Sequence, residues 1–202
     1  MPIHPARQRT CAAALFTALA LLLSFAAASA EGGRAIAPDT AAIRIDNFGR
    51  VDSTLYRGGQ PHGRDFADLK AIGVKTVVNL TSDDAMPNEQ TMTEATGMAY
   101  VQIPMTTRTA PTAAQIEQFL GIVNDRVRQP VYVHCVGGRH RTGVMTAAYR
   151  MVHDGWTADQ AFKEMKQYKF GADFLHPELR AFVYSYHPAA SVAAIATTTV
   201  QR

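Results

Sequence analysis

Short apolar runs alternate with stretches of helical periodicity along the middle of the chain. Runs of β-branched and aromatic residues predict buried strands, here over Thr76–Leu80, Tyr100–Ile103 and Val131–Val133. Apolar residues at helical spacing predict helices, here over Phe66–Ile72, Pro111–Val123, Val144–Val152 and Ala158–Met165. Alternating strands and helices indicate an α/β fold, with a single domain and a central, mainly parallel sheet flanked by helices.

The same pattern sets the expected limits of the domain. No internal repeat or low-complexity linker interrupts residues 43–187, so we expect one domain over that range. Residues 31–42 are rich in Gly, Ala and Pro and predict a loose leader. Residues 188–202 are mostly Ala, Thr and Val without periodicity, and we expect them to form a disordered tail.

The first thirty residues have the pattern of a secretory signal peptide. Arg7 and Arg9 supply a positive start, Leu15–Phe25 is almost wholly apolar, and small residues precede a cleavage point after Ala30. We therefore expect residues 1–30 to be removed and the mature protein to be periplasmic or secreted. An uncleaved membrane anchor is the alternative, since the apolar stretch is nearly long enough to span a bilayer.

Composition and charge narrow the function classes. Apolar residues make up 47% of the chain and charged residues 18%, as in a globular protein rather than a disordered one. Cleavage would remove two basic residues and no acidic one, so the formal charge would fall from +3 to +1. This small charge argues against nucleic acid as a partner, and a membrane would be contacted only through an uncleaved signal. Nothing in the pattern indicates an oligomeric state.

Cleavage would also leave Cys135 as the only cysteine, with no partner for an internal disulfide. The run H-C-V-G-G-R-H-R-T-G, His134–Gly143, begins where the last predicted strand ends. Two glycines in residues 136–140 allow backbone N–H groups to turn inward and hold a dianionic phosphoryl group. The residues expected to bind this phosphate are Val136, Gly137, Gly138, Arg139, His140 and Arg141.

The side chains around this loop have separable roles. Inward N–H groups and a helix N-terminus stabilise a thiolate, so we expect a lowered pKa for Cys135, the catalytic nucleophile. The planar fork of Arg141 can hold two phosphoryl oxygens in the transition state. Thr142 can donate its hydroxyl to the sulfur, and His134 is expected to bind backbone groups and shape the loop.

The run His134–Gly143 matches the H-C-x-x-G-x-x-R-[ST]-G signature of protein tyrosine and dual-specificity phosphatases. Leu55–Pro61, Val77–Leu80 and Gly155-Trp156 are similar to the bacterial secreted, TpbA-like branch, and the resemblance covers about Asp52 to Phe170. It implies the cysteine-dependent phosphatase fold and a phosphocysteine intermediate, with no metal or other cofactor. The implied substrates are phosphotyrosine proteins, with phosphoserine and phosphothreonine as further candidates.

One position departs from this family, in which an aspartate before the long helix usually protonates the leaving oxygen. Here Pro104–Pro111 contains no carboxylate. By topology Asp83 and Asp84 are the nearest candidates, although they could equally be solubilising loop residues or helix caps. Without a general acid, hydrolysis of substrates with poor leaving groups would slow more than hydrolysis of phosphotyrosine or phosphoanhydrides.

The charged pair Arg139-His140 suggests a second substrate class. It resembles the Lys-His pair of inositol pyrophosphate phosphatases in the same superfamily, so a small polyphosphorylated substrate is the main alternative. Arg139 could instead simply face solvent.

Two alternatives of another class are weaker. A non-catalytic phosphate-binding module would be expected to lack Cys135 or Arg141, and a rhodanese-type sulfurtransferase would not need His134 or Thr142. A metal site is not expected, because the histidines outside the loop have no ligand spacing; they include His62, His153, His176 and His187.

Overall fold

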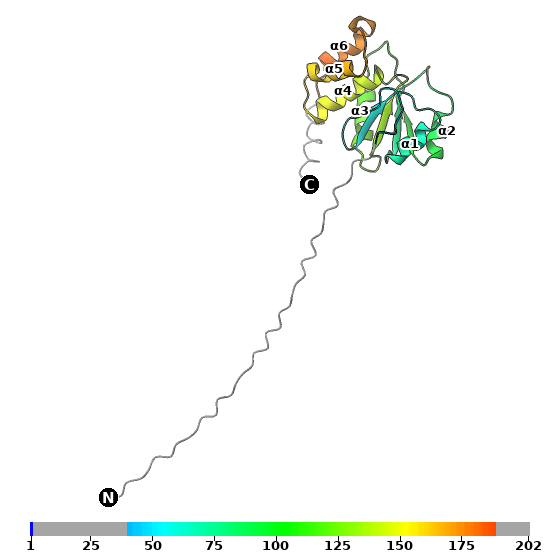
Figure 1. The fold of residues 1–202 in the computed structure, drawn as a ribbon. Helices are drawn as coiled ribbons and strands as arrows, with labels where there is room; N and C mark the ends of the chain where they lie inside the picture. The colour runs from blue at the N-terminus through cyan, green and yellow to red at the C-terminus, as the bar shows by residue number, and fades with distance from the viewer. Residues whose placement is uncertain (2–39, 189–202) are drawn as a thin grey trace. The chain divides into compact units, whose positions relative to one another are not determined.

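The computed structural model describes residues 40–188 together with Met1 (Figure 1). The predicted signal segment beyond Met1, and the predicted tail beyond its first residue, lie outside the described residues. Within the described part, no helix combines the length and apolar character needed to cross a membrane.

In residues 40–188, five short strands form one sheet, in the order β1-β2-β5-β3-β4. Strands β2, β5, β3 and β4 run parallel, and only β1 pairs antiparallel, with β2. This mixed, mostly parallel sheet flanked by helices confirms the predicted fold class. The strands are β1 (Gly49–Arg50), β2 (Leu55–Gly58), β3 (Thr76–Asn79), β4 (Ala99–Gln102) and β5 (Val131–His134).

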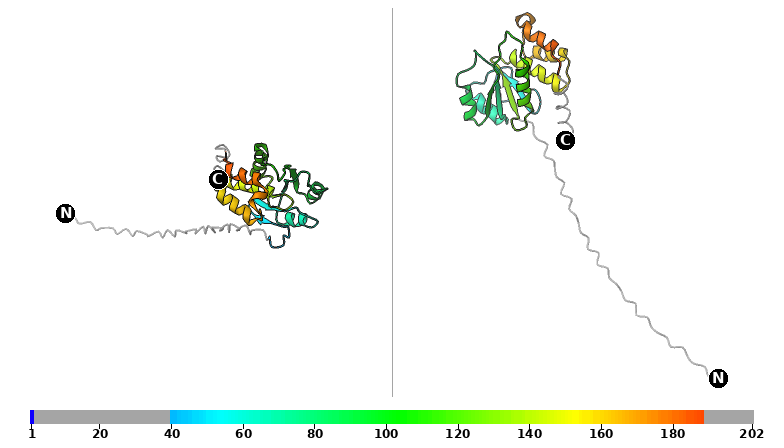
Figure 2. Two further views of the ribbon diagram at one scale, coloured as in Figure 1. Left: turned by 90° about the horizontal axis from the view of Figure 1, so that it is seen from above. Right: turned by 180° about the vertical axis from the view of Figure 1, so that it is seen from behind.

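Six helices and one 3-10 turn complete the described chain, and the helices lie on both faces of the sheet. Helices α4, α5 and α6 gather on one side, and α1 lies on the other (Figures 1 and 2). The elements are α1 (Asp65–Ala71), α2 (Glu89–Ala95), α3 (Ala113–Asn124), α4 (Arg141–His153), α5 (Ala158–Gln167), η1 (Asp173–Leu175) and α6 (Pro177–Ser185).

The two faces of the sheet have separate hydrophobic cores. Val78 and Val133 point into the core shared with α3, α4, α5 and α6, whereas Val77 and Tyr132 point into the core shared with α1. Because both faces are covered, the central strands are apolar at successive positions rather than alternating. This is why the strands were recognisable as continuous apolar runs.

Several elements were not predicted from the sequence. The strands β1 and β2, the helices α2 and α6 and the turn η1 are short or polar, so periodicity did not identify them. Helix α4 begins at Arg141, three positions before the apolar stretch Val144–Val152. Its first turn therefore belongs to the signature loop rather than to the core pattern.

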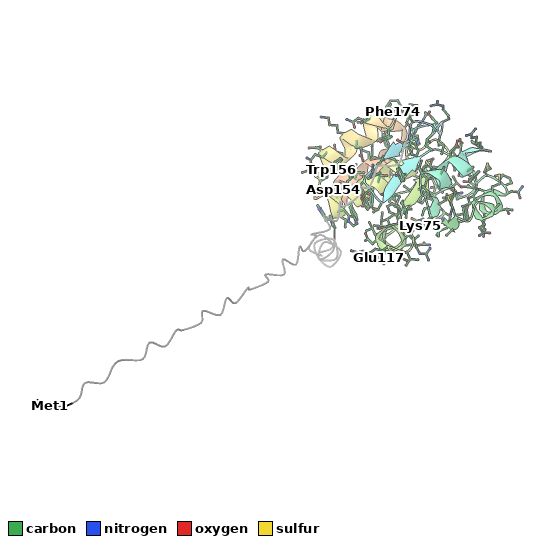
Figure 3. The ribbon with its side chains drawn as sticks, turned by 60° about the horizontal axis from the view of Figure 1, so that its bottom comes forward. Met1, Lys75, Glu117, Asp154, Trp156 and Phe174 are labelled. Atoms are coloured by element: carbon green, nitrogen blue, oxygen red, sulfur yellow. The ribbon has the colours of Figure 1, made fainter. Side chains whose placement is uncertain are left out.

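The parallel strands end together at one edge of the domain. Gly58, His134 and Asn79 lie side by side as the last residues of β2, β5 and β3. Lys75, just before β3, lies at the opposite end of the domain from Phe174 (Figure 3). Ligands of such folds bind beyond the carboxyl ends of the strands, and the signature loop follows the central strand there.

Candidate active site

The loop after β5 is held from outside by three hydrogen bonds to its carbonyl groups. Gln60 N, Asn47 Nδ2 and Arg57 Nη2 donate to the carbonyls of residues 136–138, over 2.9, 3.0 and 3.0 Å. In a trans peptide the carbonyl and the following N–H point in opposite directions. The next N–H groups therefore face the inside of the loop, and that of Arg139 bonds to the Cys135 thiol.

Gly138 makes this conformation possible. Its φ is +64°, in the left-handed region, and a Cβ there would lie 2.4 Å from the carbonyl carbon of Gly58. A side chain would thus be both strained and in collision with the backbone of β2. The two glycines expected to shape the loop differ in this respect, since Gly137 has no such close backbone neighbour.

Cys135 lies at the base of the loop with 3% of its surface exposed. Burial raises the pKa of its thiol, but hydrogen bonds from the hydroxyl and N–H of Thr142 lower it, as does the charge of Arg141. The lowering effects prevail, and the pKa lies below its ordinary value. The structure therefore brings together the predicted nucleophile, clamp and hydroxyl donor.

Arg141 is buried and forms a two-pronged ion pair. Its Nη1 and Nη2 donate to Oδ1 and Oδ2 of Asp84 over 2.7 and 2.6 Å, and Nη1 also donates to the Met105 carbonyl over 3.2 Å. The hydrogen bonds to Arg141 lower the pKa of the Asp84 carboxyl. Asp84 is thus an ionised partner of the clamp, and it also accepts a local bond from the Ser82 N–H over 3.3 Å.

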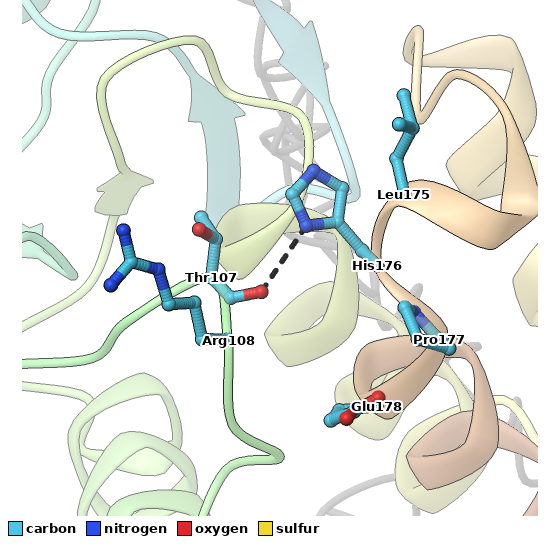
Figure 4. Close-up of a pocket in the computed structure, with 6 residues that line it drawn as sticks. All are labelled: Thr107, Arg108, Leu175, His176, Pro177 and Glu178. Atoms are coloured by element: carbon cyan, nitrogen blue, oxygen red, sulfur yellow. Dashed lines mark hydrogen bonds between the residues drawn. The ribbon is translucent and has the colours of Figure 1, made fainter.

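Two neighbouring cavities open beside this pair. The first, of about 220 Å³, is lined by Asp83, Asp84, Thr106, Thr107, Arg108 and Arg141. The second, of about 320 Å³, is lined by Thr107, Arg108, Leu175, His176, Pro177 and Glu178 (Figure 4). Thr107 and Arg108 border both cavities, so the segment Pro104–Pro111 brings a cation, and no carboxylate, to the site.

His134 has a different partner from the one predicted. Instead of bonding to backbone groups, its Nε2 lies 2.7 Å from Oε1 of Glu89, and both side chains are buried. The other oxygen of Glu89 accepts from Asn79 Nδ2 over 2.7 Å, and Asn79 in turn accepts from the N–H and hydroxyl of Thr81. This buried network ties the end of β5 to α2, an element that the apolar pattern did not reveal.

Arg139 pairs with Asp46, which lines neither cavity, whereas His140 packs against His176, which lines the second cavity. Arg139 is about half exposed and lies 3.6 Å from Asp46, close to the expectation that it faces solvent. His140 Nε2 lies 2.9 Å from the Phe170 carbonyl, and its ring packs 3.8 Å from that of His176. Burial lowers the pKa of His140, and the neighbouring His176 lowers it further, so neutral imidazole is favoured near pH 7.

Arg57 is the supporting residue whose importance sequence reasoning underestimated. It is completely buried in β2, donates to the Gly138 carbonyl, and stacks 3.8 Å above the ring of Tyr168. Burial lowers the pKa of its guanidinium, while the negative charges of Glu164 and Cys135 favour the charged form. In the sequence, Arg57 lies within Leu55–Pro61, a stretch that carries part of the family resemblance, but that stretch does not reveal its contact with the loop.

No group of three or more His, Cys, Asp or Glu residues that could hold a metal ion occurs in residues 40–188. The site as described is built from a thiol, backbone N–H groups and arginines, which suit an anion.

Comparisons with known proteins agree with this geometry. Residues 43–179 match the family described as DSP-PTPase phosphatase fused to NAD+ kinase. The chain belongs to the DSP-PTPase phosphatase family. It is therefore a phosphatase of the protein-tyrosine-phosphatase type, a phosphoric monoester hydrolase, as the resemblance implied.

Two relatives illustrate the similarity. The dual specificity protein phosphatase TpbA of Pseudomonas aeruginosa is 32% identical over 169 residues, which cover 75% of this chain and 72% of that protein. A crystal structure of that TpbA covers 78% of this chain and 92% of its own, with a TM-score of 0.61 and 26% identity. The inositol diphosphatase SIW14 of Saccharomyces cerevisiae is 25% identical over 133 residues, 63% of this chain and 47% of that protein.

Proposed function

We propose that this DSP-PTPase hydrolyses phosphotyrosine in proteins through a phosphocysteine intermediate. The proposal rests on one observation, which is that the nucleophile, the inward N–H groups and the arginine clamp lie around a single loop. Cys135, with its lowered thiol pKa, lies below inward N–H groups, and the fork of Arg141 lies beside it. Such an arrangement stabilises both a thiolate and the negative charge of the phosphoryl group in the transition state.

The reaction divides into two displacements. In the first, Cys135 Sγ forms a bond to phosphorus while the bond from phosphorus to the phenolic oxygen breaks, and that oxygen takes up a proton. In the second, water attacks phosphorus, the S–P bond breaks, and inorganic phosphate leaves. The Thr142 hydroxyl lowers the pKa of the Cys135 thiol and has no other hydrogen-bond partner among the described residues, so it is free to stabilise the thiolate as it departs.

Phosphotyrosine fits the site better than an alkyl phosphate. A phenolate leaves more readily than an alkoxide, so it depends less on a general acid, and Pro104–Pro111 supplies no carboxylate. The similarity to TpbA, a dual specificity protein phosphatase, supports the same substrate class and extends it to phosphoserine and phosphothreonine.

An inositol diphosphatase activity is the second candidate. Arg108 brings positive charge to both cavities, where it could meet a second phosphate, and the chain is similar to the inositol diphosphatase SIW14. Against it, Arg139 pairs with Asp46 away from both cavities, and Asp83 and Asp84 line the cavity that a polyanion would enter. We therefore propose phosphotyrosine, rather than an inositol pyrophosphate, as the preferred substrate.

Hydrolysis of p-nitrophenyl phosphate by the wild-type protein and the Cys135→Ser variant tests the chemistry. We expect vanadate-sensitive turnover that falls by roughly four to six orders of magnitude in the variant, as when a nucleophile is removed. Activity retained by Cys135→Ser would refute the phosphocysteine route. The ratio of kcat/KM for a phosphotyrosine peptide to that for an inositol pyrophosphate then decides between the two substrates.

We further propose that the enzyme acts outside the cytoplasm. The signal pattern of residues 1–30 supports this place of action. Fractionation of cells that express the full chain should recover a protein shortened by about thirty residues from the periplasm or medium. Full-length protein in the cytoplasm would contradict the proposal.

A further inference from the structure

Asn47 joins the signature loop to a distant part of the chain. Its Nδ2 donates to the Gly137 carbonyl and to the Tyr168 carbonyl, each over 3.0 Å. Gly137 belongs to the signature loop, and Tyr168 follows the last residue of α5. These partners are 90 and 121 positions from Asn47 along the chain. A single side-chain amide, which has two hydrogens to donate, therefore holds two separate carbonyl groups in place.

The backbone around Asn47 is adapted to this contact. Its φ is +55°, in the left-handed region that asparagine adopts more readily than most residues. Beside it, the Asp46 carbonyl accepts from the Gly59 N–H over 2.8 Å, and the Asp46 carboxylate accepts from Lys169 Nζ over 2.9 Å. Residues 46 and 47 thus contact the chain after β2, the signature loop and the end of α5. These contacts are polar, so they fix the positions of backbone groups.

The bond to Gly137 sets the direction of one particular N–H group. In a trans peptide the Gly137 carbonyl and the Gly138 N–H point in opposite directions. Because Asn47 holds this carbonyl on the outside of the loop, the N–H faces the inside. Gly138 is buried, and within residues 40–188 its N–H donates to no protein group. A buried N–H rarely lacks a partner, and a phosphoryl oxygen of the substrate would supply one.

The next N–H group has a different task. Arg57 holds the Gly138 carbonyl, which turns the Arg139 N–H toward Cys135, where it lowers the thiol pKa. The Gly138 N–H is not among the main groups that shift this pKa. Arg57 therefore acts on the nucleophile, whereas Asn47 acts on the place of the bound anion.

We propose that Asn47 is a positioning residue of the reaction, which aims the Gly138 N–H at a phosphoryl oxygen. The proposal rests on the phosphatase function above. It extends the site to a residue that lies before the stretch Asp52–Phe170, over which the sequence resembles the family. A donor that is fixed before substrate binds stabilises the charge of the transition state without having to reorganise.

The test compares Asn47→Gly with Asn88→Gly in the full chain. Glycine adopts positive φ without strain, so Asn47→Gly removes the amide and keeps the backbone conformation. Asn88 is the matched control, because its φ is +64° and its side chain makes no capping hydrogen bond. For Asn47→Gly we expect orthophosphate to bind about tenfold more weakly in isothermal titration calorimetry. The kcat/KM for p-nitrophenyl phosphate should fall by about tenfold or more, and Asn88→Gly should change neither quantity.

The thiol pKa separates this role from a general loosening of the loop. Iodoacetamide alkylation as a function of pH should give the same thiol pKa for Asn47→Gly and wild type, because the groups that lower it stay in place. A thiol pKa that rose together with the loss of phosphate binding would overturn the proposal. So would wild-type affinity for orthophosphate in Asn47→Gly, or an equal loss in Asn88→Gly. Thermal unfolding of each variant controls for misfolding.

Asn47→Asp keeps the shape of the side chain and tests its donors by pH. An ionised carboxylate donates no hydrogen bond, whereas a protonated carboxyl donates one, and two facing carbonyl oxygens favour the protonated form. The charged neighbours Asp46, Arg139 and Lys169 are the same in both proteins. The affinity of Asn47→Asp for orthophosphate, relative to wild type, should therefore rise severalfold from pH 7 to pH 5.

A relative affinity that did not change with pH would contradict the role of the donors. The orthophosphate measurement needs no turnover. If Cys135→Ser matched wild type in activity, the phosphocysteine mechanism would fail, while binding of orthophosphate would still report on Asn47.

Discussion

The signature loop has two sides that differ in how they are held. On the side of β2, Arg57 is completely buried, and its contacts are a loop carbonyl and the face of Tyr168. On the cavity side, Arg141 bonds to a carboxylate that is 42% exposed. One arginine therefore has partners that cannot leave, and the other has a partner that can. We infer that the first side sets the shape of the loop and that the second orients the arginine that holds the substrate.

Gly138→Ala should disturb the β2 side of the loop more severely than any other variant considered. A Cβ at φ +64° would lie 2.4 Å from the Gly58 carbonyl carbon, so strain and overpacking together should lower the free energy of unfolding by about 2–4 kcal/mol. Displacement of the loop by an ångström should lower kcat/KM by about a hundredfold. Denaturant titration and p-nitrophenyl phosphate turnover measure both quantities.

Gly155 offers a matched control for this variant. It has the same φ of +64°, but an added Cβ would meet nothing within 4 Å. Gly155→Ala should show the backbone strain alone, about 1–2 kcal/mol, with unchanged turnover. If the two variants behaved alike, the close approach of Gly138 to β2 would not matter for the site.

Arg57→Met should show that Arg57 supports the catalytic loop without contributing much to the free energy of unfolding. Removing a buried guanidinium with two unpartnered nitrogens relieves a desolvation cost, which offsets the lost hydrogen bond to the Gly138 carbonyl, so we expect the free energy of unfolding to change by less than about 1 kcal/mol. The Gly138 carbonyl would lose its donor and Cys135 a nearby positive charge. The pKa of the thiol should therefore rise, and turnover at acidic pH should fall by about tenfold, because a smaller fraction of the thiol is ionised.

The rate of iodoacetamide alkylation as a function of pH reports the thiol pKa directly. Arg57→Lys is the control, because it keeps the charge but not the fork. A thiol titration that is unchanged in Arg57→Met would show that Arg57 acts only through packing.

These comparisons also show what the sequence could and could not reveal. The nucleophile and the clamp were predictable because they belong to one strand–loop–helix segment, and local order places them together. The contacts that hold the loop were not, since Arg57 and Gly138 are 81 positions apart and Asp84 and Arg141 are 57 apart. Likewise, Glu89 lies on α2, a helix that the spacing of apolar residues did not predict. Such partners become visible only when the sheet order brings the strand ends together.

The smallest expected effect is the contribution of the Asp84–Arg141 pair to the free energy of unfolding. Hydrogen bonding to Arg141 lowers the pKa of Asp84 in the folded state. Such a group stabilises the fold above its unfolded pKa, near 3.9, and this contribution disappears as the pH falls through the lower folded pKa. Because Asp84 is 42% exposed, solvent screening limits the effect to about 1 kcal/mol or less.

Unfolding of wild type and Asp84→Asn from pH 7 down to pH 2 measures this contribution. Asparagine keeps the shape and one acceptor, so the difference in free energy between the two proteins reports the charge. It should be constant between about pH 5 and 7 and should vanish in acid. The difference between wild type and Arg57→Met should not follow this titration, because the direct contacts of Arg57 are a carbonyl and an aromatic ring. A difference of several kcal/mol for Asp84→Asn, or one that persisted at pH 2, would mean that Asp84 is a structural partner of Arg141. The two sides of the loop would then be held equally firmly, and the contrast between them would be lost.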